Sequence, residues 1–62
     1  MKAQNLRKLR ISLGLTVGGC AEKMGLTRQT IINIESGKTT KESSLKYYEM
    51  YLKEVRRKQQ SQ

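Results

Sequence analysis

Two stretches with helical spacing of apolar residues are separated by only three residues, Gly25-Leu26-Thr27. The first stretch, residues 17–24, has the i, i+3, i+4, i+7 spacing of one buried helix face, made by Val17, Cys20, Ala21 and Met24. The second stretch is residues 28–36. Each stretch follows a threonine that can serve as its N-cap, Thr16 before the first and Thr27 before the second. A connection this short forces a sharp turn between two helices, and Gly25 can adopt the positive φ that such a turn needs.

The rest of the chain also shows helical periodicity. Residues 3–13 carry one stripe of Leu6, Leu9 and Leu13 and stop at Gly14. A last helix is expected to start within residues 40–44, where Thr39 and Glu42 have capping-box spacing. Its apolar stripe is Leu45, Tyr48, Leu52 and Val55, and residues 59–62 are expected to fray. The sequence therefore predicts an all-α single domain over residues 1–62, a compact bundle with helices at about 3–13, 17–24, 28–36 and 41–58.

Composition argues against an enzyme. The 62 residues include no Asp or His and a single Cys, so neither a usual catalytic triad nor a multi-ligand zinc site can be assembled. We expect no metal, no cofactor and no small-molecule ligand. Cys20 is expected to be a core residue without a redox role. No apolar run approaches the roughly 20 residues that span a bilayer, which favours a cytoplasmic protein with no membrane partner.

The charge balance points to a polyanionic partner. Thirteen Lys and Arg residues stand against five acidic ones, a formal net charge of +8. Nucleic acid is the commonest partner of such a chain, with membrane surfaces and acidic proteins as alternatives.

The helix at residues 28–36 has one face that its anchor residues do not use. At about 100° per residue, Ile31 and Ile34 fall together on the inner side. The other side carries Arg28, Gln29, Ile32, Asn33 and Ser36. Arg can address guanine, Gln and Asn can address adenine, and an aliphatic side chain can contact the thymine methyl. An ordinary solvated face would more often carry Glu and Lys, so we interpret this face as a DNA readout surface.

Residues 6–37 resemble the helix-turn-helix domain of the lambdoid phage repressor and Cro family. The matching segments are Leu9-Arg10, Leu13-Gly14-Leu15-Thr16, the run from Cys20 to Thr27, and Ile31-x-x-Ile34-Glu35-x-Gly37-Lys38. The resemblance implies a lambda-repressor-like domain of four or five helices that binds operator DNA as a dimer, usually to repress transcription.

The resemblance also implies roles for individual residues. Arg28, Gln29 and Asn33 match base-reading positions, and Thr27 and Thr30 match phosphate-facing ones. Arg10 and Glu35 match a structural ion pair between the first and third helices, and their places beside the two apolar stripes support it independently. Lys38, just past the recognition helix, and Arg7 are further expected phosphate contacts.

Three departures from the family pattern concern the second helix. Val17 stands where Gln usually clamps a phosphate and braces the first reading residue. Gly18 and Gly19 replace good helix formers, and Cys20 replaces Leu. Either this helix is unusually soft, which we favour, or its backbone approaches DNA or a partner closely at the two glycines.

The last helix carries more apolar surface than one face can bury. The surplus residues, Tyr47, Met50, Tyr51 and Val55, suggest a homodimer interface. The alternative is a long helix with partly exposed tyrosines. The basic residues between 53 and 58 are interpreted as a solvated helix end rather than a DNA contact.

Taken together, the sequence predicts a sequence-specific DNA-binding transcriptional regulator, repressor-like or Cro-like, that reads double-stranded operator DNA in the major groove. Two alternatives use other surfaces. A protein-interaction module, such as an antitoxin, would need a broader apolar patch on the third helix. A sequence-independent packaging protein would need more Lys and Arg there.

Overall fold

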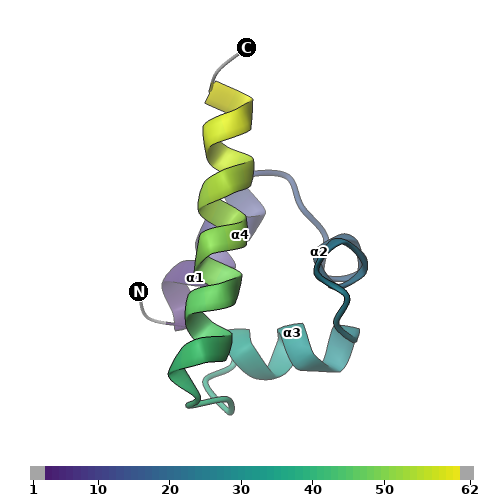
Figure 1. The fold of residues 1–62 in the computed structure, drawn as a ribbon, viewed down its shortest axis with the longest axis vertical. Helices are drawn as coiled ribbons and strands as arrows, with labels where there is room; N and C mark the ends of the chain where they lie inside the picture. The colour runs from purple at the N-terminus through teal and green to yellow at the C-terminus, as the bar shows by residue number, and fades with distance from the viewer. Residues whose placement is uncertain (1–2, 61–62) are drawn as a thin grey trace.

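The computed structural model describes residues 3–60, which form four helices: α1 (Ala3–Ser12), α2 (Val17–Met24), α3 (Arg28–Glu35) and α4 (Glu42–Gln60). Figure 1 shows α4 as the long upright helix with α1 behind it, α3 crossing the base of the molecule, and α2 seen nearly end-on at one side. The steep angle between α2 and α3 is the one expected from their short connection. The fold is all-α: the described residues contain these four helices, joined by short turns and loops, and no strand.

The core is made by all four helices. Leu6 comes from α1, three small or flexible residues come from α2, two isoleucines come from α3, and an aromatic and an aliphatic residue come from α4; the set is Leu6, Cys20, Ala21, Met24, Ile31, Ile34, Tyr48 and Leu52. Partly buried residues, Leu9, Leu13, Leu15, Val17, Leu26, Leu45 and Tyr51, pack around them. The predicted apolar stripes therefore meet in one cluster, except for Val55, which is half-buried and lies outside it. The stripe residues at the edge of the cluster are also only half-buried: Leu9, Leu13, Val17 and Leu45.

The turn between α2 and α3 is closed by backbone hydrogen bonds. Gly25 has φ 71° and ψ 30°, and its N–H reaches the carbonyls of Ala21 and Glu22. The N–H of Leu26 donates to the Ala21 carbonyl at 2.8 Å. This arrangement satisfies carbonyls that the end of α2 would otherwise leave unpaired, and it depends on the left-handed conformation that glycine adopts without strain.

The N-terminal caps of α2 and α3 are the two threonines that the sequence indicates. Thr16 Oγ1 accepts from the N–H of Gly19 at 2.9 Å. Thr27 Oγ1 accepts from the N–H of Thr30 at 3.2 Å. Each bond occupies one of the backbone donors that a helix start leaves unsatisfied.

Several predicted boundaries are corrected by one or two residues. Helix α1 ends at Ser12 because Leu13 and Gly14 already form the following turn, and α3 ends at Glu35 with Ser36 as its C-cap. The capping box at Thr39 is wrong: α4 begins at Glu42, after Lys41, whose carbonyl accepts from the N–H groups of Ser44 and Leu45.

The C-terminal end of α4 is longer than predicted. Gln59 and Gln60 are helical, and the Gln59 side chain donates to the Leu13 carbonyl at 3.1 Å, which holds the end of α4 against the turn after α1. The expected fraying of residues 61–62 lies outside the described residues. Between residues 3 and 60, no helix has the length and apolar character needed to cross a bilayer.

Candidate nucleic-acid interface

Helix α3 is anchored by one face and exposes the other. Ile31, Ile34 and Glu35 are buried against the other helices. The predicted base-reading residues Arg28, Gln29 and Ile32 are exposed, and Asn33 is half-buried. Ile32 leaves 46% of its surface exposed, a large fraction for an isoleucine in a chain with so few core residues.

Two of these side chains are already paired in the free protein. The amide nitrogen of Gln29 donates to the amide oxygen of Asn33 at 2.9 Å, an i, i+4 contact along the exposed face. Each amide keeps further donors and acceptors for another partner. The pair therefore limits the rotamers of two amides that are suited to adenine.

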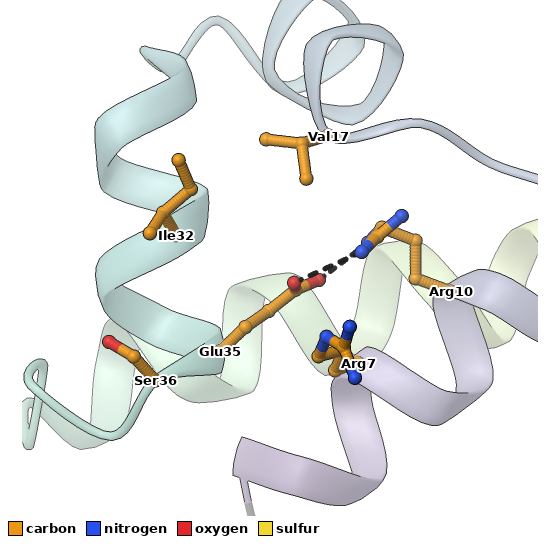
Figure 2. A pocket seen from close by; sticks show the side chains of 6 residues that line it. All are labelled: Arg7, Arg10, Val17, Ile32, Glu35 and Ser36. Carbon is orange, nitrogen blue, oxygen red and sulfur yellow. Dashed lines mark hydrogen bonds and ion pairs between the residues drawn. The ribbon is translucent and has the colours of Figure 1, made fainter.

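A shallow recess of about 420 Å³ lies beside this face. It is lined by Arg7 and Arg10 from α1, Val17 from α2, and Ile32, Glu35 and Ser36 at the end of α3. Figure 2 shows Val17 and Ile32 approaching each other from α2 and α3, with Arg7 on the α1 side. Two aliphatic side chains thus border a recess whose opposite rim carries a cation.

Val17 was not among the predicted contact residues. Sequence spacing assigns it to the core stripe of α2, and it does contact the core, but it is also half-exposed on the recess. The available signal was the resemblance, because Val17 stands where the family usually has a Gln that clamps a phosphate.

The predicted phosphate contacts surround the same face. Thr27 is exposed and Thr30 half-buried at the start of α3, and their hydroxyl oxygens lie 2.8 Å apart in a shared hydrogen bond. Lys38 is exposed in the loop after Gly37, and Arg7 is exposed on α1. Two hydroxyls therefore lie at the start of α3, one cation borders the recess from α1, and another follows the end of α3 in the chain.

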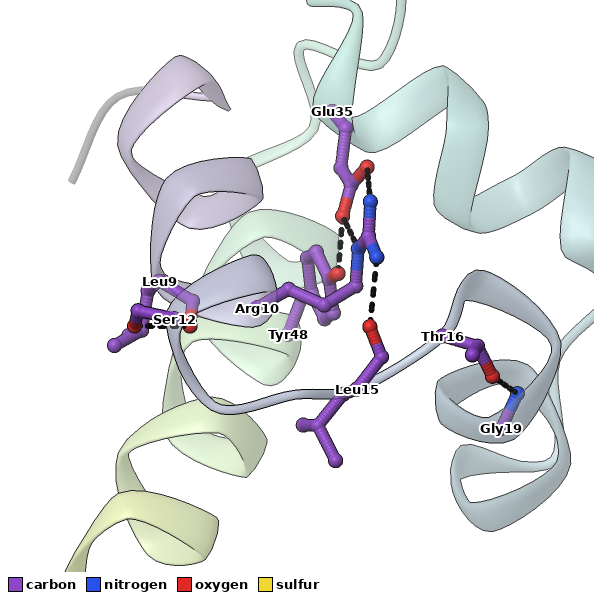
Figure 3. Close-up of polar contacts among 8 residues, drawn as sticks. All are labelled: Leu9, Arg10, Ser12, Leu15, Thr16, Gly19, Glu35 and Tyr48. Atoms are coloured by element: carbon purple, nitrogen blue, oxygen red, sulfur yellow. Dashed lines mark hydrogen bonds and ion pairs between the residues drawn. The ribbon is translucent and has the colours of Figure 1, made fainter.

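The predicted ion pair between α1 and α3 is present and buried. Arg10 Nε donates to Glu35 Oε2 at 2.7 Å, and Arg10 Nη2 lies 3.3 Å from Glu35 Oε1. Arg10 Nη1 also donates to the Leu15 carbonyl at 2.8 Å (Figure 3). The hydrogen bond to Glu35 raises the pKa of Arg10 above its ordinary value, against the opposing effect of burial.

Sequence analysis missed the third member of this cluster. The Tyr48 hydroxyl donates to Glu35 Oε2, so one carboxylate joins α1, α3 and α4 (Figure 3). Burial, together with this hydrogen bond, raises the pKa of Tyr48 well above its usual range. The available signal was that a tyrosine on a core stripe needs a partner for its hydroxyl. The cluster fixes the orientation of α3 against the rest of the fold.

Cys20 contributes packing to this core. It is buried beside the cluster, and burial raises the pKa of its thiol. A protonated, inaccessible thiol is a poor nucleophile, which is the behaviour of a small core residue.

The predicted dimer residues on α4 differ in how much of their surface is exposed. Tyr47 and Met50 expose 50% and 61% of their surface. Tyr51 and Val55 are half-buried, and Tyr51 packs against the core of its own chain. The Tyr47 hydroxyl donates to the Met24 carbonyl at 3.2 Å, so this ring also covers the end of α2.

Charges near the end of α4 are partly paired among themselves. Lys53 Nζ lies 2.8 Å from Glu49 Oε2, and Arg57 Nη2 lies 2.5 Å from Glu54 Oε1. These i, i+4 and i, i+3 contacts agree with the interpretation of a solvated helix end.

The fold and the exposed face of α3 define the class of DNA-binding helix-turn-helix proteins. A family model described as helix-turn-helix matches residues 6–47, which covers most of α1, all of α2 and α3, and the start of α4. The chain therefore belongs to the helix-turn-helix family of repressor- and Cro-like DNA-binding domains. Comparisons with curated proteins and with solved structures gave no match.

Proposed function

We infer that this chain is a sequence-specific transcriptional regulator of the repressor-like or Cro-like kind, which reads operator DNA by placing α3 in the major groove. The observation that carries this inference is the exposed face of α3, with Arg28, Gln29 and Ile32 exposed and the Gln29–Asn33 pair formed. Arg28 suits guanine, the two amides suit adenine, and Ile32 suits the thymine methyl. A packaging protein needs no such variety of side chains.

Contacts to the phosphate backbone are assigned to residues at the edges of that face. Thr27 and Thr30 offer hydroxyls at the start of α3, Arg7 offers a cation from α1, and Lys38 offers one from the loop after α3. Such contacts set the register of the protein on the duplex and make the affinity salt-dependent.

One recognition helix contacts only a few base pairs, too few to specify a single site in a genome. Two copies related by a twofold axis would place their α3 helices in successive major grooves, about 34 Å apart, on a nearly palindromic site. The exposed side chains of Tyr47 and Met50, with Tyr51 and Val55 beside them, form the surface that we assign to this pairing.

The test is selection of binding sites. Purified protein is mixed with a pool of duplexes carrying a randomised central segment, and the bound DNA is sequenced after several rounds with excess unrelated competitor. A regulator of this kind enriches one motif with half-sites about 10 base pairs apart between centres.

Two other outcomes would contradict the proposal. Retention of the pool without enrichment of any motif would indicate sequence-independent packaging. No retention of DNA at moderate salt would favour a protein-interaction module such as an antitoxin.

A further inference from the structure

Gly18, in the first turn of α2, lies directly beneath the side chain of Arg28. A Cβ atom built on Gly18 would lie 3.0 Å from Arg28 Nε, 3.2 Å from Nη2 and 3.4 Å from Cζ. All three atoms belong to the guanidinium, so this group covers the Gly18 α-carbon. Any residue other than glycine would push the guanidinium outward by at least a few tenths of an ångström.

Backbone conformation does not explain a glycine at this position. The glycines with positive φ are Gly14, Gly25 and Gly37, whereas Gly18 is helical. Glycine within a helix is less favourable than almost any other residue. The space that Gly18 leaves for the Arg28 side chain therefore gives this glycine a specific role. This role is distinct from the lower helix stability that the two glycines give to α2.

The contact orients Arg28 without using its hydrogen-bonding capacity. Among residues 3–60, no hydrogen bond or ion pair engages the Arg28 guanidinium, and its side chain is exposed. The covering contact is one of packing, so the N–H groups of the guanidinium stay available for an acceptor pair such as guanine O6 and N7.

We propose that Gly18 is a positioning residue for base readout: it lets Arg28 lie across the first turn of α2 and so sets which base Arg28 addresses. This role rests on the proposed function. At the start of α2, Val17 has an aliphatic side chain and Gly18 has none, so neither can hydrogen-bond to Arg28 through its side chain. The orientation of Arg28 therefore comes from the space above Gly18. Holding the group in one place before binding reduces the entropy lost on DNA.

The Gly18→Ala variant separates positioning from folding. Alanine is the better helix former, and the group it meets is the flexible end of an exposed side chain, so the melting temperature should stay equal or rise. Affinity for the duplex that the wild-type protein selects should fall about tenfold, within the range for one bidentate base contact. Affinity for an unrelated duplex of equal length should not change.

Arg28→Ala supplies the coupling test. If Gly18 acts through Arg28, then Gly18→Ala causes no further loss when Arg28 is already alanine. A new round of selection with Gly18→Ala should relax the base preference at the same position of each half-site as selection with Arg28→Ala. A merely structural role of Gly18 would not move the preference at one particular base.

Gly19→Ala is the matched control, since it adds the same methyl group one residue later. That methyl meets Thr16 Oγ1 at 3.0 Å, so its effect acts on the N-cap of α2 and on stability. We expect it to leave the selected motif unchanged.

Two results would overturn the role of Gly18 while leaving the proposed function intact: equal or tighter binding of the selected duplex by Gly18→Ala, or an equal loss in the Arg28→Ala background. Failure of the wild-type protein to select any motif would instead overturn the proposed function and this role with it.

Discussion

Arg10 and Glu35, 25 residues apart, form a buried ion pair in which Arg10 Nε lies 2.7 Å from Glu35 Oε2. The same carboxylate accepts from Tyr48, and the same guanidinium donates to the Leu15 carbonyl. One charge pair therefore joins α3 to α1, to α4 and to the loop before α2. Its partners satisfy both charged groups, which is the condition under which a buried pair is tolerated.

Replacing one member of the Arg10–Glu35 pair should lower the free energy of unfolding more than replacing both members. Arg10→Met or Glu35→Gln alone should lower the free energy of unfolding by about 3 kcal/mol, because each leaves a buried polar group without its partner. The double variant should lose less than either single variant. Urea titrations of the three variants measure this, and additive losses would show that the two residues do not depend on each other.

Tyr48→Phe should be destabilising at neutral pH. The lost hydroxyl donates to a charged acceptor, a kind of bond that contributes about 1.5–3 kcal/mol. Tyr47→Phe is the matched control: its hydroxyl bonds a neutral carbonyl from a half-exposed side chain, so its removal should cost about 1 kcal/mol or less. Equal losses in urea titrations would argue against a special contribution from the Glu35 bond.

The raised pKa of Tyr48 also predicts a loss of stability at alkaline pH. Above pH 10 the unfolded chain releases the Tyr48 proton while the folded chain retains it, so unfolding becomes more favourable as pH rises. The contribution of this group is fully present below about pH 10 and declines above it by up to about 1.4 kcal/mol per pH unit. Tyr48→Phe should show a correspondingly shallower decline between pH 9 and pH 11; an identical decline would contradict the assignment.

Gln29 and Asn33 should act as a unit in DNA binding. Each alanine substitution should weaken binding to the selected duplex by about 1–3 kcal/mol, since each removes an amide suited to a base edge. Because the two side chains are hydrogen-bonded to each other, the double variant should lose less than the sum. Binding isotherms at one salt concentration test this, with an unrelated duplex as the control for non-specific affinity.

Binding should weaken steeply with salt. A dimer that neutralises about eight phosphates gives a log–log slope near −7. Lys38→Ala removes one cation from each copy and should make the slope shallower by about 2. Lys53→Ala, which removes a cation paired with Glu49, should leave the slope unchanged. A wild-type slope shallower than about −3 would count against a DNA-binding role.

Met50→Glu is the sharpest test of the proposed dimer surface. Among residues 3–60, Met50 is the most exposed of the large apolar residues. Tyr51 instead packs on its own core, so a charge at Tyr51 would also disturb folding. Ile11→Glu places the same charge at an exposed apolar residue of α1 and serves as the control. Sedimentation of both variants, with and without DNA, should show loss of the dimer for Met50→Glu only. If Met50→Glu still dimerises, the dimer interface does not include this surface of α4.

Sequence alone determined the features that depend on neighbouring residues. The bounds of α2, the caps at Thr16 and Thr27, and the left-handed Gly25 follow from apolar periodicity and from hydrogen bonds that span at most five residues. The exposed face of α3 follows from the same periodicity. The Arg10–Glu35 pair was also predictable. Each residue lies beside an apolar stripe, and two opposite charges that become buried when these stripes pack together are stable only as a pair.

Tertiary structure alone decided the contacts that depend on how the helices cross. Sequence spacing does not identify Glu35 as the partner of the Tyr48 hydroxyl, the recess that Val17 and Ile32 share, or the position of Arg28 over Gly18. Each needs the angle and separation between two helices, which the packing of the whole core sets at once. Side-chain spacing along one helix carries no information about that angle. The residues around the exposed face of α3 could therefore be named from the sequence, while their mutual arrangement could not.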